Sequence, residues 1–173
     1  MNTGEQNSFL KAYEDFSDAI FRYCYFRLYH RELAKDLAQE TFIKTWEYIA
    51  KGGKVQNIRA FLYRVARNLI IDESRKKRMF SLDLLREKGF DPAVSMEEEI
   101  QSHAGVRDVM KFLSDLEPKY REVIILRFVE DMSPKEIAEA IGESENNISV
   151  RLHRAIKKVR ELIEKESRHH ESR

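Results

Sequence analysis

The sequence predicts an all-α protein built from two small helical domains that are joined by a flexible linker. Helix breakers are scarce, with 6 Gly and 3 Pro in 173 residues, and strong helix formers such as Glu, Lys, Leu and Ala are abundant. Apolar residues recur at steps of three and four, which is the period of one helix face. This period is lost over residues 80–103, and a structureless stretch of that length is rare inside one compact domain.

The N-terminal domain is expected at residues 1–79 and contains three amphipathic patterns. Apolar stripes run over residues 9–28, 33–49 and 58–69. The Lys-Gly-Gly-Lys sequence at residues 51–54 predicts the loop between the second and third helices, because glycine favours turns. The single cysteine, Cys24, falls on the first stripe and is expected to be a buried, reduced thiol.

The C-terminal domain is expected at residues 104–166, followed by a disordered tail at residues 167–173. Residues 133–136 (Ser-Pro-Lys-Glu) have the form of a capping box with proline at the first helical position. Gly142 ends that short helix, and a longer basic helix follows it. A capped short helix, a glycine turn and a basic second helix predict a helix-turn-helix.

The net charge of +1 conceals two basic segments that are separated by an acidic one. Residues 59–78 hold seven Lys/Arg and two Asp/Glu, a balance of +5, and residues 151–165 hold six and two, a balance of +4. Residues 91–117 hold two Lys/Arg and seven Asp/Glu, a balance of −5. Two basic segments indicate two places that meet phosphates, and hence a nucleic-acid partner.

The second helix of the helix-turn-helix would present its N-terminal residues to base edges in the major groove. Asparagine can pair with adenine, and arginine with guanine, through two hydrogen bonds each. Basic residues farther along the helix would reach phosphates. The alternative is an ordinary helical hairpin with a solvated basic face. The candidate duplex-binding residues are Asn146, Asn147, Ser149, Val150, Arg151, His153, Arg154 and Lys157.

The helix over residues 57–78 backs its apolar stripe with a basic face, a combination that suits single-stranded DNA. Cations follow the phosphates of such a strand, while aromatic or arginine planes stack on its bases. The alternative is an amphipathic helix whose charged face is only solvated. The candidate strand-binding residues are Asn57, Tyr63, Arg64, Arg67, Asn68, Arg75 and Lys76.

A third candidate surface combines acids, an amide and an apolar residue on one face of the second helix. Its members are spaced by three and four residues, so they are neighbours on the helix surface. Such a face could dock a basic partner helix, and the alternative is a set of surface salt bridges. The residues are Asp36, Gln39, Glu40 and Ile43.

Signs of catalysis are weak, and we expect no catalytic residues, metal or cofactor. The five histidines are scattered without metal-ligand spacing, no glycine-rich loop cradles phosphates, and Cys24 has no evident histidine partner. No apolar stretch approaches the roughly 20 residues that cross a bilayer. The N-terminus lacks the pattern of a secretory signal, so we expect a cytoplasmic protein.

Five segments occur in the order and spacing of a known family over about residues 9–163. They are Asp-Leu-Ala-Gln-Glu-Thr-Phe at 36–42, Phe-Leu-Tyr-Arg-Val-Ala-Arg-Asn-Leu-Ile-Ile-Asp at 61–72, Leu-Glu-Pro-Lys-Tyr-Arg-Glu-Val at 116–123, Glu-Ile-Ala-Glu at 136–139 and Arg-Leu-His-Arg-Ala at 151–155. Together they resemble the extracytoplasmic-function sigma factors of bacterial RNA polymerase.

The resemblance implies a non-enzymatic subunit that recruits core RNA polymerase to promoter DNA and is restrained by an anti-sigma factor. The helix over residues 36–46 would grip the clamp coiled coil of the largest polymerase subunit. The loop at residues 52–57 and the helix after it would read and melt the −10 element, and the helix-turn-helix would read the −35 element. The chain departs from the family pattern at Phe61, where Trp is frequent, and at the start of the recognition helix. There the family commonly has Gly-Thr-Val and Lys-Ser-Arg, and this chain has Asn-Asn-Ile at residues 146–148 and Ser-Val-Arg at residues 149–151, so that Val150 replaces a hydroxyl residue. The −35 sequence preference therefore does not carry over.

Two rival functions make different demands on the chain. A stand-alone helix-turn-helix regulator would need neither the 36–46 face nor the basic 59–78 helix, and would usually dimerise on a two-fold site. Binding to core polymerase separates it from an initiation factor. An all-helical nuclease would need metal-binding carboxylates that converge on one site. A metal-dependent cleavage assay tests for such an activity.

Overall fold

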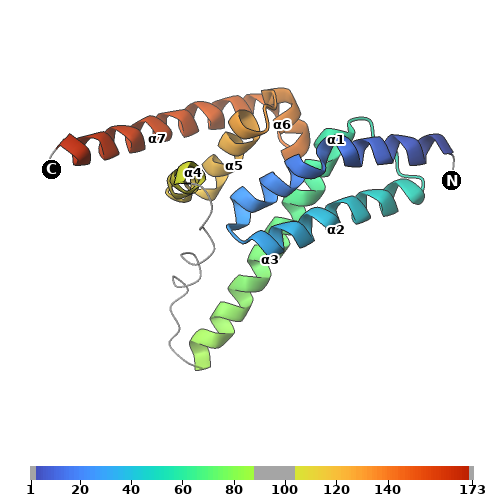
Figure 1. The fold of residues 1–173 in the computed structure, drawn as a ribbon, viewed down its shortest axis with the longest axis horizontal. Coiled ribbons are helices and arrows are strands. Elements are labelled where there is room, and N and C mark those ends of the chain that lie inside the picture. Colours follow the sequence, from blue (N-terminus) through green and yellow to red (C-terminus); the bar gives the residue numbers. More distant parts are fainter. Residues whose placement is uncertain (1–2, 88–103, 172–173) are drawn as a thin grey trace. The chain divides into compact units, whose positions relative to one another are not determined.

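The protein consists of two compact units, Met1–Gln101 and Ser102–Arg173. The structure is a computed structural model and describes residues 3–87 and 104–171. All regular elements within the described residues are helices (Figure 1), and each unit has a hydrophobic core of its own. The expectation of an all-α protein is confirmed.

The N-terminal unit is formed by α1 (Thr3–Leu28), α2 (Arg31–Ala50) and α3 (Ile58–Glu87), and each of these helices contacts the other two. Its core lies on the expected stripes of the three helices. The largest side chains that are fully buried there are Ile20, Tyr23, Leu62 and Tyr63. Cys24 is buried beside them as a free thiol. Burial raises the pKa of that thiol from 9.0 to about 12, against a smaller lowering by Arg27.

The turns of the N-terminal unit are fixed by local hydrogen bonds. Tyr29 adopts a left-handed φ of 55°, and His30 Nδ1 accepts a hydrogen bond from Leu33 N (3.1 Å), which caps α2. Asn57 Oδ1 accepts one from Ala60 N (3.1 Å) at the start of α3. These caps satisfy backbone donors that a helix N-terminus leaves without partners.

Helix α3 is longer than the expected N-terminal domain, which ended at residue 79. It continues to Glu87, because no Gly or Pro interrupts the chain between Ile58 and Gly89 and its last residues are mostly good helix formers. Met79 is 67% exposed, so the helix extends past the core. Residues 80–87 of the expected linker are therefore helical, and residues 88–103 lie outside the described residues.

The C-terminal unit contains α4 (Ala104–Ser114), α5 (Pro118–Ile124), the π-helical turn η2 (Ile125–Val129), α6 (Pro134–Ile141) and α7 (Glu145–Glu171). Helix α7 packs against both α5 and α6. The core of this unit is aliphatic and includes Met110, Val123, Ile125, Leu126, Met132, Ile137, Ile148 and Ala155.

One arginine joins α4 to α5. Arg121 Nε donates to the Leu113 carbonyl (2.7 Å), and its Nη2 donates to the carbonyls of Ser114 and Leu116 (3.0 Å each). These carbonyls lie at and just after the C-terminal end of α4, where backbone acceptors lack partners within the helix. The Leu-Glu-Pro-Lys-Tyr-Arg segment seen in the sequence thus supplies a cap for the preceding helix.

The expected disordered tail at residues 167–173 is wrong for most of its length, since α7 continues to Glu171. The extension contains no Gly or Pro. Glu164 and Arg168 form an exposed pair four residues apart (3.9 Å), and such pairs support an exposed helix. Residues 172–173 lie outside the described residues.

Candidate functional site

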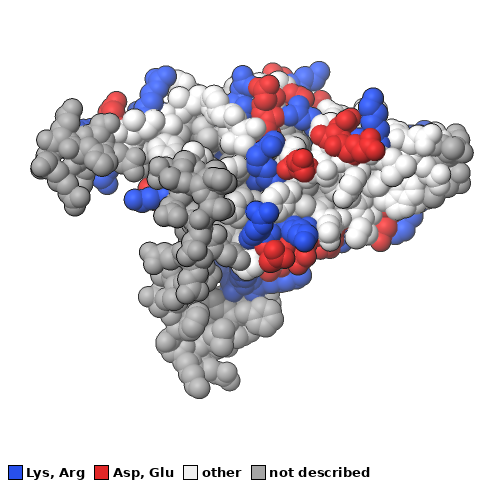
Figure 2. All heavy atoms as spheres, in the orientation of Figure 1, with Lys and Arg blue, Asp and Glu red and all other residues white. Residues whose placement is uncertain are grey.

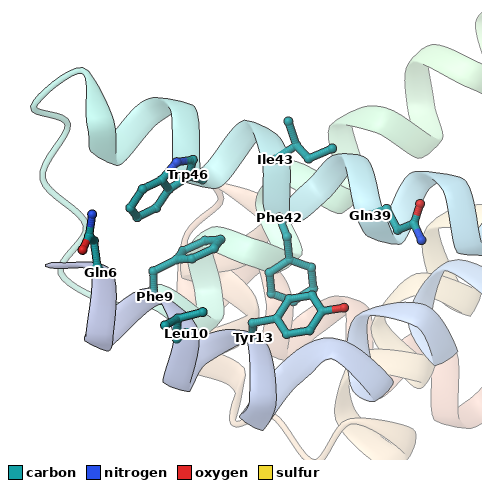
Figure 3. Close-up of a pocket in the computed structure, with 8 residues that line it drawn as sticks. All are labelled: Gln6, Phe9, Leu10, Tyr13, Gln39, Phe42, Ile43 and Trp46. Carbon is teal, nitrogen blue, oxygen red and sulfur yellow. The ribbon is translucent and has the colours of Figure 1, made fainter. Parts of the chain in front are cut away.

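An apolar groove lies between α1 and α2 (Figure 3). Its volume is about 630 Å³, and aromatic rings line it, with Phe9 packed on Trp46 and Tyr13 on Phe42, each pair at 4.9 Å between ring centroids. Large apolar side chains remain exposed at its rim, namely Leu10 (58%), Tyr13 (47%) and Ile43 (57%). An open apolar groove of this kind suits an amphipathic partner helix.

Two of the four predicted polymerase-binding residues belong to this groove. Gln39 and Ile43 line it directly (Figure 3), and Asp36 is exposed one turn earlier on α2. Glu40 is half-buried and forms an ion pair with Lys44 at 3.3 Å. Sequence spacing found the polar residues of α2, but not the apolar residues that α1 contributes.

The basic face of α3 presents most of its predicted strand-binding residues to solvent. Arg64, Asn68, Arg75 and Lys76 are exposed, whereas Arg67 is half-buried. Arg75 forms a weak, solvated pair with Asp72 at 3.9 Å. The half-buried Asn57 serves as the cap of α3, so its side chain already has a structural role.

Tyr63 is a correction to the predicted strand-binding set. Its side chain is 1% exposed and packs edge-to-face on Tyr23, with 5.3 Å between ring centroids. A ring inside the core cannot stack on a base. Tyr63 is buried because the core face of α3 includes it together with Leu62, Ala66 and Ile70, whereas the stripe inferred from sequence included Phe61 and Val65, which are half-buried.

A different aromatic pair lies at the loop between α2 and α3. Tyr48 is 45% exposed, and its ring lies 4.9 Å from that of Phe61 at an interplanar angle of 31°. Gly53 lies directly beneath the Tyr48 ring. Lys51 and Lys54 are exposed in the same loop. This side of the N-terminal unit combines an accessible ring with cations, a pairing that sequence analysis assigned to Tyr63.

The helix-turn-helix of α6 and α7 has the predicted capping. Ser133 Oγ accepts from Glu136 N (3.2 Å), while Ser133 N donates to Glu136 Oε2 (2.8 Å), which completes the capping box. Gly142 ends α6 in the left-handed region with φ 79°, a conformation that disfavours any side chain with a Cβ. Ser144 Oγ accepts from Asn147 N (3.2 Å) and caps α7.

Helix α7 presents nearly all the predicted duplex-binding residues on its outer side. Ile148, Leu152 and Ala155 anchor the helix in the core. The exposed residues are Asn146, Asn147, Ser149, Val150, His153, Arg154 and Lys157.

Arg151 is the exception, because its side chain is only 22% exposed and faces the turn. Its Nη2 donates to Glu143 Oε2 at 2.6 Å, in an ion pair that is less exposed and shorter than that of Lys44 with Glu40. No helical spacing in the sequence predicts this pair. An arginine so held must give up or share this bond before it reads guanine with two donors.

Charge alone does not delimit these surfaces. Figure 2 shows Lys and Arg side chains interspersed with Asp and Glu over the described residues of one face.

Within residues 3–87 and 104–171, no three His, Cys, Asp or Glu side chains converge as ligands for a metal ion. None of the described helices combines the length and hydropathy that crossing a membrane requires.

Comparison with known families gives a match for each unit. Residues 12–79 match Sigma-70 region 2, and residues 107–159 match Sigma-70, region 4. The two matches together cover more than two thirds of the chain.

Curated relatives match nearly the whole chain. The ECF RNA polymerase sigma factor SigW of Bacillus subtilis is 28% identical, over 92% of this chain and 91% of its own length. The ECF RNA polymerase sigma factor BldN of Streptomyces coelicolor is 29% identical over 95% of this chain, which spans only 64% of that longer relative.

Solved structures share the fold. The sigma factor RpoE of Bartonella quintana, in complex with the anti-sigma factor NepR, aligns with a TM-score of 0.75 at 24% identity, over 91% of this chain and 97% of that one. CnrH, in complex with the cytosolic domain of CnrY, aligns with a TM-score of 0.66 at 24% identity, over 92% and 89%. The matched regions, the relatives and the helix-turn-helix geometry agree, and the chain belongs to the sigma-70 family of RNA polymerase sigma factors, as a member of the extracytoplasmic-function type.

Proposed function

We propose that this protein directs promoter-specific transcription initiation by binding core RNA polymerase and reading two promoter elements. The observation that carries the proposal is the capped helix-turn-helix of α6 and α7, whose outer side exposes Asn146, Asn147 and Lys157. In this proposal the polymerase performs the chemistry, so the protein itself is not an enzyme. Because it works on the polymerase, its place of action is the cytoplasm. Run-off transcription with core polymerase, followed by sequencing of the start sites, tests the proposal. Transcripts that do not depend on the added protein would contradict it.

The groove between α1 and α2 is the proposed docking surface for core polymerase. Burial of Leu10, Tyr13 and Ile43 by an amphipathic helix would remove exposed apolar area from water, while Asp36 and Gln39 would meet polar groups at the edge. Asp36→Ala combined with Gln39→Ala should weaken binding to core polymerase in a pull-down. Both side chains are exposed, so the circular dichroism spectrum should stay unchanged. Unaltered capture of the folded double variant would contradict this assignment.

The exposed face of α3 and the preceding loop are the proposed −10 surface. Arg64, Asn68 and Arg75 offer cations and an amide to an unpaired strand, and Tyr48 offers the ring that buried Tyr63 cannot. Base–aromatic stacking contributes about 1–3 kcal/mol per base. This offsets the few kcal/mol that unstacking a base costs.

An anti-sigma factor is a further proposed partner. The RpoE and CnrH structures, which share this fold, are both complexes, and that of RpoE contains the anti-sigma factor NepR. A protein that covers the apolar groove of the N-terminal unit would compete with core polymerase for the same side chains. The groove also favours an initiation factor over a stand-alone regulator, because a stand-alone regulator has no need of a docking surface for core polymerase.

A further inference from the structure

The outer side of α7 has an apolar residue at its centre. Val150 is 43% exposed and lies two residues after buried Ile148 and two before buried Leu152. Two residues correspond to a little over half a helical turn. The Val150 side chain therefore points away from the core, on the side of the helix that a helix-turn-helix turns toward DNA.

The neighbours of Val150 on this side are polar or basic. Asn146 and Asn147 precede it by four and three residues, and Arg154 and Lys157 follow it by four and seven, and all four are exposed. A β-branched residue is a weaker helix former than alanine, so an exposed valine adds nothing to the stability of α7. The fold does not account for the valine at this position.

Arg151, on the flank of the same helix, is poorly placed to recognise guanine. Arg151 donates to Glu143 at 2.6 Å, and the backbone of Glu143 is itself fixed by a hydrogen bond from its N–H to the Ala138 carbonyl (3.1 Å). Bidentate reading of guanine needs two donors of one guanidinium. The pair with Glu143 directs that group toward the turn, whereas Val150 remains exposed near the start of the helix together with polar residues that include the two asparagines and Ser149.

We propose that Val150 determines −35 specificity by contacting the C5-methyl group of a thymine in the major groove. This inference rests on the proposed function of α7 as a duplex reader. The thymine methyl is the one apolar group that base pairs display in that groove, and asparagine pairs with adenine. Arg154 and Lys157 supply the positive charge that duplex phosphates require. The recognition helix therefore selects A·T pairs at its centre.

The experiment isolates the methyl group on the DNA. Holoenzyme reconstituted from the full-length chain and core polymerase selects its preferred duplexes from a pool randomised over the −35 element. Each thymine of the preferred element is then replaced by deoxyuracil, which lacks only the methyl. We expect replacement at one position to weaken binding about fourfold, the effect of one buried methyl group.

The matching change in the protein is Val150→Ala, which leaves the helix intact or slightly more stable. This variant should bind the thymine duplex about fourfold more weakly and should not respond to deoxyuracil at the same position. Val150→Ile keeps the apolar contact and should keep the response. Lys157→Ala is the control for phosphate contacts, and it should weaken binding to all duplexes alike.

The possible outcomes separate this inference from the proposed function. A pool that yields no preferred −35 sequence would overturn duplex reading by α7 and this inference with it. A preferred element without thymine on either strand would overturn the thymine contact alone. So would a deoxyuracil effect that is absent at all positions, or one that persists unchanged in Val150→Ala.

Discussion

Gly53→Ala should destabilise the N-terminal unit modestly, for a reason that depends on a single neighbouring side chain. A Cβ at Gly53 would lie 2.3–2.6 Å from three atoms of the Tyr48 ring, whereas carbon atoms in contact normally lie about 3.5–4.0 Å apart. Tyr48 is 45% exposed, so its ring can rotate outward and leave the backbone in place. That rotation gives up its contact with Phe61 at 4.9 Å.

The expected cost of Gly53→Ala follows from that lost contact. An aromatic pair contributes about 0.5–1.5 kcal/mol, and the lower entropy of the unfolded chain returns about 0.5 kcal/mol when alanine replaces glycine. The free energy of unfolding should therefore fall by up to about 1 kcal/mol. In a Tyr48→Ala background no ring is displaced, and Gly53→Ala should instead stabilise by about 0.5 kcal/mol.

Urea denaturation measures this reversal of sign. Trp46 is the only tryptophan in the chain and lies in α2, so its fluorescence reports on the N-terminal unit. Gly52→Ala is the matched control: nothing lies within 4 Å of its Cβ, but its φ is +86°. Backbone strain should cost about 1–2 kcal/mol in either background. An equal loss for Gly53→Ala with and without the Tyr48 ring would refute the argument.

Three further predictions concern other parts of the chain. Arg121→Ala should lower the stability of the C-terminal unit by at least about 2 kcal/mol, because three carbonyls lose a charged donor; thermal denaturation measures it, and an unchanged melting temperature would contradict the capping role. The raised pKa of Cys24, about 12 against 9.0 for a free thiol, contributes stability that is complete below pH 9 and is lost as the pH rises toward 12. Cys24→Ala should flatten that loss in alkaline urea titrations, and a parallel decline in both proteins would exclude the thiol as its cause. Arg64→Ala with Asn68→Ala should impair strand opening at matched promoter occupancy, and normal permanganate reactivity of promoter thymines would refute the assignment.

Local patterns predicted those parts of the fold that depend on neighbours in sequence. The capping box of Ser133 and Glu136 and the left-handed Gly142 both formed as expected. Each depends on residues within one helical turn, where spacing and geometry are nearly equivalent. The ends of α3 and α7 were predicted too early, because the apolar stripe marks only the part of a helix that packs on the core. Both helices continue past that part, since no Gly or Pro interrupts them there.

Tyr63 and Tyr48 show why the strand-binding surface could be predicted only in part. Both tyrosines lie on helices near basic residues, and only packing distinguishes the 1% exposure of Tyr63 from the 45% exposure of Tyr48. Helix α3 contacts both α1 and α2, so the part of its circumference that is buried is wider than one apolar stripe and includes Tyr63. Sequence period gives the direction of a buried face but not its width.

The pair of Arg151 and Glu143 marks a second limit of sequence reasoning. The two residues are eight positions apart and lie on opposite sides of the start of α7, so no helical spacing links them. Their contact depends on the conformation of the turn, which Gly142 and the hydrogen bond from Glu143 N to the Ala138 carbonyl determine. An arginine that appears free in sequence is therefore half-buried and already bonded.

Helix α7 separates the residues that maintain the fold from those that would choose the promoter. Ile148, Leu152 and Ala155 are buried, and replacing a large one among them would cost several kcal/mol. Val150, between the first two of them, and Asn147, just before the first, are exposed, and surface substitutions usually change stability by about 0.5 kcal/mol or less. Members of one family can therefore keep the same buried stripe while the outer residues change freely. For this reason the matched sigma-70 regions and the curated relatives identify the chain as a sigma factor, whereas the side chains that would set its −35 preference are the ones that this particular helix exposes.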